Sequence, residues 1–274
     1  MRKTKITDKI LLCLTRFFAG LTLMILSLII LYILINGIPH LRPSLFALRY
    51  TADNASMFPS IISTLIIIMI TMLFAVPLGI FTGIYLVEYT KKGSRFVTVV
   101  RSATELLAGI PSIVYGLFGL LFFVEFLKIG FSVLSGSLTL SIMVLPLIIR
   151  TTQEALKSVP DGYREGSFAL GAGKLRTVFK VVLPSAMPGI LAGVILAIGR
   201  VIGESAALIF TAGTIPQIPN SLLQSARTLS VHMWALSGEG HNTNEAYATA
   251  VILLVIVFII NAASAFVAKK IARR

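Results

Sequence analysis

Six apolar segments, each about 20 residues or longer, restrict the fold of this chain more than any other feature of its sequence. A helix of roughly 20 apolar residues crosses the hydrocarbon core of a bilayer, because each residue rises about 1.5 Å. Backbone polar groups in lipid must bond within their own segment, which favours helices. We therefore predict an all-α membrane protein with six transmembrane helices, at about residues 14–36, 60–87, 104–127, 131–150, 186–210 and 246–268.

Composition agrees with this prediction, since only 13% of the residues are charged and the mean hydropathy is +0.92. A soluble domain has about a quarter of its residues charged. The first segment is too long for a signal peptide and no small-residue cleavage site follows it, so we interpret it as a retained span. The fourth segment is the least apolar of the six, because serines and glycines dilute it: Ser132, Ser135, Gly136, Ser137 and Ser141.

The basic residues predict the orientation. Nineteen of the 24 Lys and Arg residues lie on one side of the six predicted spans, together with both chain ends. Cytoplasmic loops carry such an excess, so we expect both termini in the cytoplasm. The formal net charge of +13 then reflects anchors near anionic headgroups, and no nucleic-acid partner is predicted. Cys13 is the only cysteine, which excludes an intramolecular disulfide, and no metal site is predicted.

We divide the chain into an N-terminal span with its outer loop, residues 1–58, and a core at residues 59–274. The core holds a cytoplasmic loop at about 151–185 and an outer loop at 211–245, in which "SARTLSVHMWAL" indicates a short helix. The "GAGK" of the cytoplasmic loop lacks the spacing of a phosphate-binding loop, so no nucleotide site is predicted.

A short helix is expected inside the cytoplasmic loop. Ser158 and Asp161 fit the start of a helix, and Gly171 or Gly173 fits its end. Tyr163, Phe168 and Ala169 would share an apolar side. This side either rests on the chain's own helices or docks into a groove of a cytoplasmic partner.

Arg200 and Glu204 place two opposite charges inside the apolar fifth segment. We predict that they face each other one helical turn apart as an ion pair, with Arg200 near the middle of the membrane. The pair either locks two helices together or serves as a relay, in which a passing oxyanion displaces the carboxylate from the guanidinium. Ser205 and Thr211 could add hydroxyl donors to such a pathway.

The cytoplasmic loop resembles the EAA motif of ABC importer permeases, which lies between the fourth and fifth of six spans. The matching positions are Glu165, Gly166, Ser167, Gly171, Leu183 and Pro184, with Gly166 where the family often has alanine. The resemblance implies the type I ABC importer permease fold. It also implies that these residues form a coupling helix that sits in a cleft of an ATPase subunit.

Three further stretches resemble the phosphate-specific ABC permeases: "GIPSIVYGLFGLLFF" at 109–123, "GRVIGESAALIFTAG" at 199–213 and "AYATAVILL" at 246–254. The second is closer to the A-type subunit (PstA) than to the C-type, although Gly-Glu-Ser-Ala-Ala-Leu replaces the usual Gly-Glu-Thr-Ala-Pro-Leu. Arg200 matches the arginine that this family needs for transport. The resemblance covers most of the chain from about residue 58 onward.

This resemblance implies a non-catalytic, multi-pass subunit of a bacterial or archaeal cytoplasmic membrane. Its expected partners are a C-type permease subunit, two ATPase subunits that bind ATP-Mg, a periplasmic or lipid-anchored phosphate-binding protein, and membrane lipids. No cofactor is expected in the chain itself. Charge alone does not separate phosphate from sulfate or molybdate. A self-sufficient secondary transporter and a membrane scaffold are the alternatives, but the one mid-membrane acid and the lack of an evident repeat favour neither.

Overall fold

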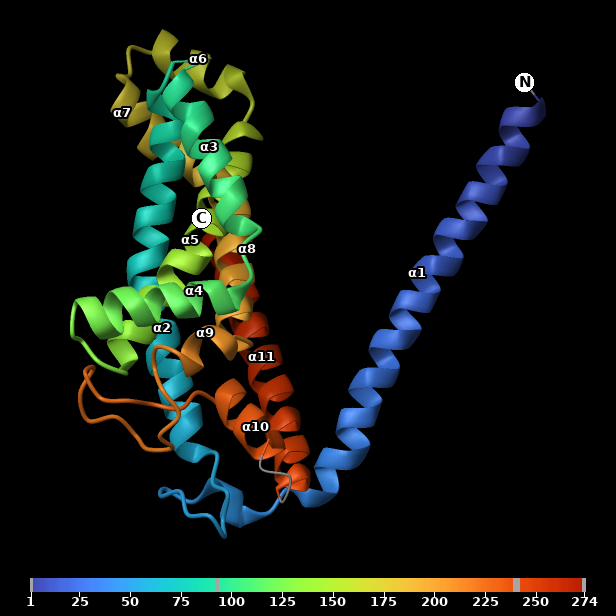
Figure 1. The fold of residues 1–274 in the computed structure, drawn as a ribbon. Helices are drawn as coiled ribbons and strands as arrows, with labels where there is room; N and C mark the ends of the chain where they lie inside the picture. Colours follow the sequence, from blue (N-terminus) through green and yellow to red (C-terminus); the bar gives the residue numbers. More distant parts are fainter. Residues whose placement is uncertain (1, 92–93, 239–241, 273–274) are drawn as a thin grey trace.

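The computed structural model describes residues 2–91, 94–238 and 242–272, and in this part of the chain all regular structure is helical (Figure 1). Turns of π-helix at Tyr85–Tyr89, Leu120–Phe126 and Val178–Val182 continue or precede the longer helices. The α-helices are α1 Arg2–Gly37, α2 Phe58–Ile84, α3 Arg95–Ala108, α4 Ser112–Gly119, α5 Val133–Lys157, α6 Asp161–Ala169, α7 Lys174–Thr177, α8 Leu183–Ile202, α9 Ala206–Ile209, α10 Leu229–Gly238 and α11 Thr243–Ala272.

The described helices provide five straight membrane spans and a sixth that is bent. The straight spans are Leu11–His40, Phe58–Tyr89, Val133–Lys157, Lys174–Ile202 and Thr243–Phe266. This confirms an all-α membrane fold. The third span, predicted at 104–127, is bent, because Val97–Ala108 and Ser112–Phe126 meet at an angle of 102°.

The bend of the third span lies at the Gly-Ile-Pro sequence of residues 109–111. Pro111 has extended backbone torsions, φ −59° and ψ 142°, and proline has no N–H for a helical hydrogen bond. The hydroxyl of Tyr115 donates to the Leu107 carbonyl oxygen at 2.8 Å and so links the two arms. The bend therefore has a local sequence cause and a side-chain contact that holds it.

The fifth span also differs from the prediction at both ends. Its helical run begins at Lys174, well before the predicted residue 186, and ends at Ile202 instead of residue 210. Gly203, Glu204 and Ser205 then leave the helix, and the chain re-enters a single turn, α9. Hydropathy extended this span too far, because apolar residues continue through the break.

Helix α5, the least apolar of the predicted spans, is the most buried one. In its most apolar stretch 67% of the residues are buried, against at most 33% in the other straight spans. Its small residues allow close approach: Ser141 donates to the Thr71 carbonyl oxygen of α2 at 3.1 Å, and Gly193 of α8 packs directly on Thr151. The serines that weakened the apolar signal thus face protein, and α5 becomes the centre of the bundle between α2 and α8.

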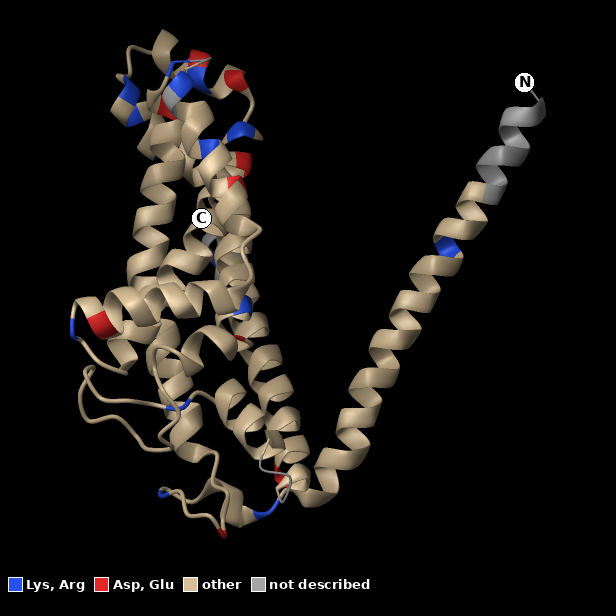
Figure 2. Ribbon diagram, viewed as in Figure 1, with Lys and Arg blue, Asp and Glu red and all other residues tan. Residues whose placement is uncertain are grey.

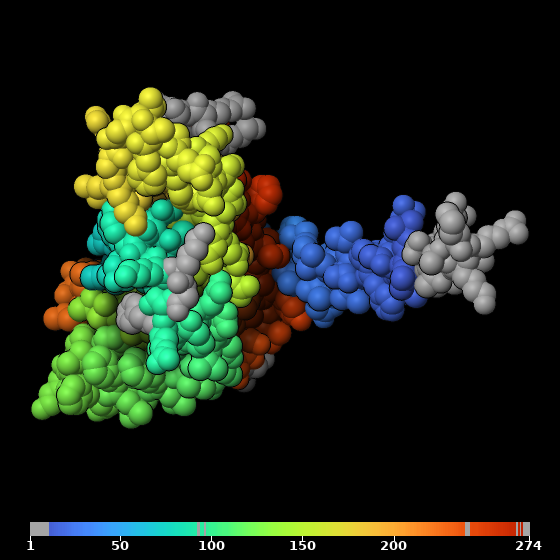
Figure 3. All heavy atoms as spheres, turned by 90° about the horizontal axis from the view of Figure 1, so that it is seen from above, coloured from blue at the N-terminus to red at the C-terminus, as the bar shows by residue number. Residues whose placement is uncertain are grey.

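Helix α1 diverges from the bundle and touches it only near its C-terminal end (Figures 1 and 3). There Gly37 packs on Tyr247 of α11, and the rings of Tyr32 and Tyr247 meet edge to face. The most apolar stretch of α1 is entirely unburied within this chain. Its apolar surface is therefore available to lipid or to another membrane protein.

Charged side chains gather at the end of the bundle that carries α3, α6 and α7 (Figure 2). The start of α1 and the end of α11 lie in the same half of the molecule (Figure 1). At the opposite end, α10 matches the predicted outer helix and packs in a small core with the first outer loop, formed by Leu45, Ala55, Met57, Leu229, Leu236, Ala246 and Ala248.

Candidate functional site

The break after α8 gives Glu204 a different role from the one its sequence position suggested. Its carboxylate accepts the backbone N–H of Ala207 at 3.1 Å and so caps the first turn of α9. Its carbonyl oxygen accepts the hydroxyl of Ser230 at the start of α10. The predicted Arg200–Glu204 ion pair is absent from this structure, because α8 ends before Glu204 and the carboxylate is committed to α9.

Arg200 has no hydrogen-bond or ion-pair partner in the part of the chain that the structure describes. It is partly exposed and lines two cavities. One, of about 260 Å³, lies between α3 and α5; the other, of about 610 Å³, lies between α8 and Asn261 of α11. Arg200 therefore presents an unpaired guanidinium to open space beside a buried helix.

Ser205 and Thr211 flank α9 differently. Thr211 is fully buried, and its hydroxyl donates to the Ala207 carbonyl oxygen at 2.8 Å. Ser205 is partly exposed, and its hydroxyl makes no hydrogen bond with the described residues. Of the two hydroxyls proposed for the pathway, only that of Ser205 is free to donate in this arrangement.

Small residues in α4 and α9 allow these two short helices to pack closely at the break after α8. A Cβ at Gly116 of α4 would lie 2.9 Å from the Cα of Ala207, and one at Gly119 would collide with Thr139 and Thr211. The run of small residues after Glu204 therefore lets α4, the second arm of the bent span, lie directly on α9. The bent third span and the interrupted fifth span are therefore in contact with each other through α4 and α9.

The cytoplasmic loop folds as predicted into a short helix, α6, ended by a left-handed glycine. Gly171 has φ +81°. Ser158 does not cap α6, since its hydroxyl donates back to the Ala155 carbonyl oxygen and Pro160 precedes the helix instead. The prediction that Ser158 caps this helix is therefore wrong, although the predicted helix is present.

The six residues that match the EAA motif fall into two groups. Glu165, Gly166 and Gly171 are exposed, and a Cβ at either glycine would meet no atom within 4 Å. Ser167 shares a 2.8 Å hydrogen bond with Thr177 of α7, while Leu183 and Pro184 start α8, with Leu183 against a buried cluster. Thus one group faces outward and the other fixes the loop to the fifth span.

Large apolar side chains of this loop are also exposed, including Leu170 at 91% and Leu175 at 66%, together with Tyr163 and Phe168. They do not pack on the chain's own helices, which was the first of the two interpretations open from the sequence. An exposed apolar group on a short helix between two spans favours the second, a docking surface for a partner.

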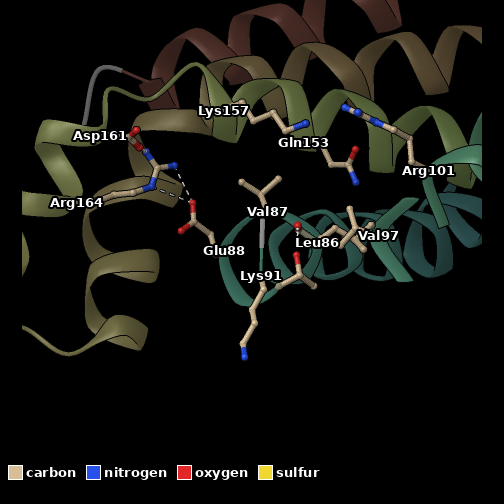
Figure 4. Close-up of a pocket in the computed structure, with 11 residues that line it drawn as sticks. Leu86, Val87, Glu88, Lys91, Val97, Arg101, Gln153, Lys157, Asp161 and Arg164 are labelled. Atoms are coloured by element: carbon tan, nitrogen blue, oxygen red, sulfur yellow. Dashed lines mark hydrogen bonds and ion pairs between the residues drawn. The ribbon is translucent and has the colours of Figure 1, made fainter. Parts of the chain in front are cut away.

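Arg164 ties α6 to two membrane helices, a role that the sequence did not reveal (Figure 4). Its guanidinium pairs with Glu88, at the end of the second span, at 2.8 Å, and the two side chains are only 15% and 8% exposed. It also donates to the carbonyl oxygens of Leu156, in the last turn of α5, and of Val159, just after that helix, at 2.9 and 2.8 Å. The partner of Glu88 is thus a residue of the loop between the fourth and fifth spans, 76 positions further along the chain.

Two polar stripes were also missed, one on α3 and one on α5. The residues are spaced three or four apart, so each stripe occupies one face of its helix. On α3 they are Arg101, Thr104 and Glu105, and on α5 they are Arg150, Gln153, Glu154 and Lys157. All of them line the cavity of about 260 Å³, which Arg200 also lines. The helical spacing was visible in the sequence, but which helices would face each other was not.

The end of the bundle opposite α6 holds one buried cation, Arg227, beside His232. Arg227 donates to the Thr214 carbonyl oxygen at 2.7 Å, lies over the ring of Tyr50 and contacts Nδ1 of His232. Burial, and next the charge of Arg227, lower the pKa of His232 to about 4. His232 is therefore neutral, with Nδ1 accepting from Arg227 and Nε2 donating to the Ala55 carbonyl oxygen. No group of three or more His, Cys, Asp or Glu residues that could hold a metal ion occurs in the described ranges.

Comparisons with known proteins agree with this geometry. The sequence model of the family described as "binding-protein-dependent transport system inner membrane component" matches residues 75–274. The chain is 37% identical over 251 residues to the probable ABC transporter permease protein YqgI of Bacillus subtilis, covering 86% of this chain and 85% of that one. It is 33% identical over 227 residues to the phosphate transport system permease protein PstA 2 of Mycobacterium bovis, covering 82% and 75%.

Among solved structures, a chain of the bacterial alginate ABC transporter, in complex with an alginate pentasaccharide-bound periplasmic protein, superposes with a TM-score of 0.63. The match covers 92% of this chain and 94% of that chain at 16% sequence identity. At this identity the likeness shows a shared fold and carries no statement about the transported compound.

Proposed function

Because the chain belongs to the family of binding-protein-dependent transport system inner membrane components, we propose that it is a permease subunit of an ATP-driven importer of inorganic phosphate. It is a multi-pass protein of the cytoplasmic membrane. The PstA name of the mycobacterial relative supports phosphate as the transported ion. The single observation that carries the proposal is the unpaired guanidinium of Arg200, which lines a cavity within the membrane-spanning bundle.

The chemistry of Arg200 suits a tetrahedral oxyanion. A guanidinium inside the hydrocarbon region of a membrane is costly, so it needs protein, water or an anion beside it. Its planar fork can donate two parallel hydrogen bonds to two oxygens of one phosphate. An anion in the adjoining cavity of about 260 Å³ would offset the charge that the described residues leave unpaired.

Release from Arg200 needs a competing group, because a binding site that holds the ion too tightly would trap it. Glu204 was the first candidate for this role, and here it caps α9. Glu105 of α3 lines the same cavity as Arg200. We assign the competing carboxylate to Glu105, with Glu204, Ser205 and Thr211 shaping the break beside the pathway.

The loop of α6 and α7 is the proposed docking element for an ATPase subunit. Its exposed Glu165, Gly166 and Gly171 and its apolar side chains support this assignment. In this arrangement the chain supplies no ATP site and no catalytic group, and two partner ATPase subunits bind ATP-Mg. A C-type permease completes the pore and a phosphate-binding protein delivers the ion on the outer side, with both termini of this chain in the cytoplasm.

The test is phosphate uptake by proteoliposomes that contain the complete complex, with ATP inside and loaded binding protein outside. Arg200→Gln should reduce uptake at least about 100-fold, since a lost charge-assisted bidentate contact is worth on the order of 3 kcal/mol. Arg42→Gln, on the exposed first outer loop, removes the same charge from a side chain that lines none of these cavities and should leave uptake unchanged.

Co-purification of all subunits with the Arg200→Gln chain shows that assembly is intact. Normal uptake by that assembled variant would contradict the proposal. Phosphate flux through this chain alone would point to a secondary transporter instead. Sulfate or molybdate uptake that exceeds phosphate uptake would assign another oxyanion.

A further inference from the structure

A third cavity continues from the cavity of about 260 Å³ beside Arg200 toward the α6 end of the bundle. It has a volume of about 410 Å³ and lies between the end of the second span, α3, α5 and α6 (Figure 4). Three residues line both cavities: Arg101 of α3 and Gln153 and Lys157 of α5. The two cavities therefore meet at these three side chains, and Arg200 lies beyond them on the first.

The charges at this junction are basic and uncompensated. Arg150 pairs with Glu154 at 3.0 Å, and Arg164 pairs with Glu88 and Asp161, which accounts for most of the acids around the two cavities. The side chains of Arg101 and Lys157 make no ion pair or hydrogen bond with any residue that the structure describes. Glu105, on the Arg200 side, is the remaining acid of the lining. Two free cations thus project where the cavities join.

Gln153 adds a neutral polar group to this junction. It is 8% exposed, and its amide makes no hydrogen bond within the described ranges. Its amide atoms remain accessible from the cavity, since they are not among the fully buried polar atoms that lack a partner. Figure 4 shows its side chain directed into the cavity, between Arg101 and Lys157. A group in the cavity that accepts and donates hydrogen bonds would satisfy it.

We propose that Arg101, Gln153 and Lys157 form a second oxyanion site, which receives the ion after Arg200 on its way toward the α6 end. This inference rests on the proposed function and names a second binding position on the same route. The guanidinium, the ammonium and the amide N–H all donate to phosphate oxygens. The amide oxygen of Gln153 can accept the hydroxyl that inorganic phosphate carries at neutral pH and that sulfate and phosphodiester headgroups lack.

A second site has a physical use. An ion leaves a strong binding position faster when a further position of similar strength lies next to it, since each step then crosses a smaller barrier. Arg101, in the middle of α3, and Lys157, the last residue of α5, are both exposed, and headgroups of anionic lipids attract such basic side chains. The same chemistry would therefore bind free phosphate or a lipid phosphate, and the experiment has to separate them.

The binding test uses thiol protection in the assembled complex. Cys13 is the only cysteine of the chain, so Cys13→Ser provides a background for Gln153→Cys. A negatively charged thiol reagent, scored on this chain by intact mass, should react at least about fivefold more slowly with millimolar phosphate than without it, since each charge-assisted contact is worth more than 1 kcal/mol. Adding Arg101→Gln and Lys157→Gln should remove this protection, and equal rates with and without phosphate would overturn the proposal.

Nanodiscs distinguish the two sources of phosphate chemistry. In neutral lipid, inorganic phosphate should protect the thiol and sulfate should protect it less. Protection by anionic lipid with no further effect of inorganic phosphate would assign the position to a headgroup and overturn the proposal. Ser102→Cys, on the exposed side of α3 and outside both cavities, is the control and should react at the same rate throughout.

A transport test uses a matched pair of double variants. Arg101→Gln with Lys157→Gln should lower maximal phosphate uptake about tenfold or more. Arg95→Gln with Lys180→Gln removes the same two charges from exposed side chains near the same end and should not lower it. Phosphate uptake that needs Arg200 but is equal in both double variants would reject the second site and leave the proposed function standing. A wild-type complex that moves no phosphate would reject the function itself.

Discussion

At the scale of single residues, the most informative contacts are those that join segments far apart in the sequence. Arg164 and Glu88 are 76 residues apart, yet their ion pair links the cytoplasmic loop to the second span, and the same guanidinium binds two carbonyl oxygens at the end of α5. A movement of α6 would therefore be transmitted to two membrane helices through one side chain.

Glu88→Ala should lower the stability of the purified chain by roughly 3 kcal/mol, because it removes the buried carboxylate partner of a largely buried guanidinium and leaves only the exposed Asp161 as an ionic partner. Thermal unfolding in detergent measures the change. Arg164→Ala alone and the double variant complete a cycle, in which the double variant should lose clearly less than the two single losses together. Strict additivity would show that the pair carries no coupling.

His232 gives the outer end a defined dependence on pH. Its pKa in the folded chain is about 4, below the usual 6.5, so between these values the unfolded chain binds a proton that the folded chain does not. The stabilising contribution is full above pH 6.5 and is lost as the pH falls toward 4, by up to roughly 3 kcal/mol. His232→Gln should therefore flatten the fall in melting temperature between pH 7 and pH 5. An equal fall in the variant would assign the effect to other groups.

At the scale of elements, function depends on where helices stop. The third span bends at Gly109–Pro111, the fifth stops at Ile202, and α6 stops at Gly171. The first two interruptions put α4 on α9, and the third orients the exposed apolar residues that follow α6. Each interruption has a glycine or proline at the place where regular hydrogen bonding ends.

Gly171→Val tests the last of these interruptions. A branched side chain disfavours φ +81°, which should shift the end of α6 and weaken binding of the ATPase subunit about tenfold, equivalent to 1–2 kcal/mol of backbone strain. Gly173→Val is the control, since Gly173 is also exposed but has φ −71° and free space around its Cβ. Pull-down of the ATPase subunit measures both, and equal retention would contradict docking at this loop.

At the scale of the whole molecule, the charge distribution predicts the orientation. Charged residues gather at the end that holds α3, α6 and α7, and the outer loops lie at the other (Figure 2). In intact cells with a Cys13→Ser background, Ser221→Cys should react with a membrane-impermeant maleimide, and Lys174→Cys should react only after permeabilisation. Both residues are exposed within this chain. The reverse pattern would invert the topology and with it the proposed direction of transport.

Much of the fold could be predicted from the sequence. The apolar segments predicted the number of membrane spans, with the bent pair as one span, and of the two glycines offered for the end of the loop helix the structure selects Gly171. The boundaries of the third and fifth spans could not be predicted by hydropathy, because apolar residues run through both interruptions. The fourth segment has the lowest hydropathy of the predicted spans because of its serines and glycines. These small residues allow other helices to pack closely around it, so it is the most buried span.

The sequence by itself determined that this chain crosses a membrane several times, carries its charges mainly at one end, and holds an arginine where lipid cannot solvate it. These properties follow from composition and local spacing, because the free energy of placing a segment in lipid depends directly on its apolar and charged residues. Only the tertiary structure decided that Glu204 caps α9, that Glu88 meets Arg164, and that Arg101 of α3 lines the same two cavities as Gln153 and Lys157 of α5. The reason is that such contacts depend on which helices pack together and at what rotation, and helical periodicity constrains each helix only with respect to itself.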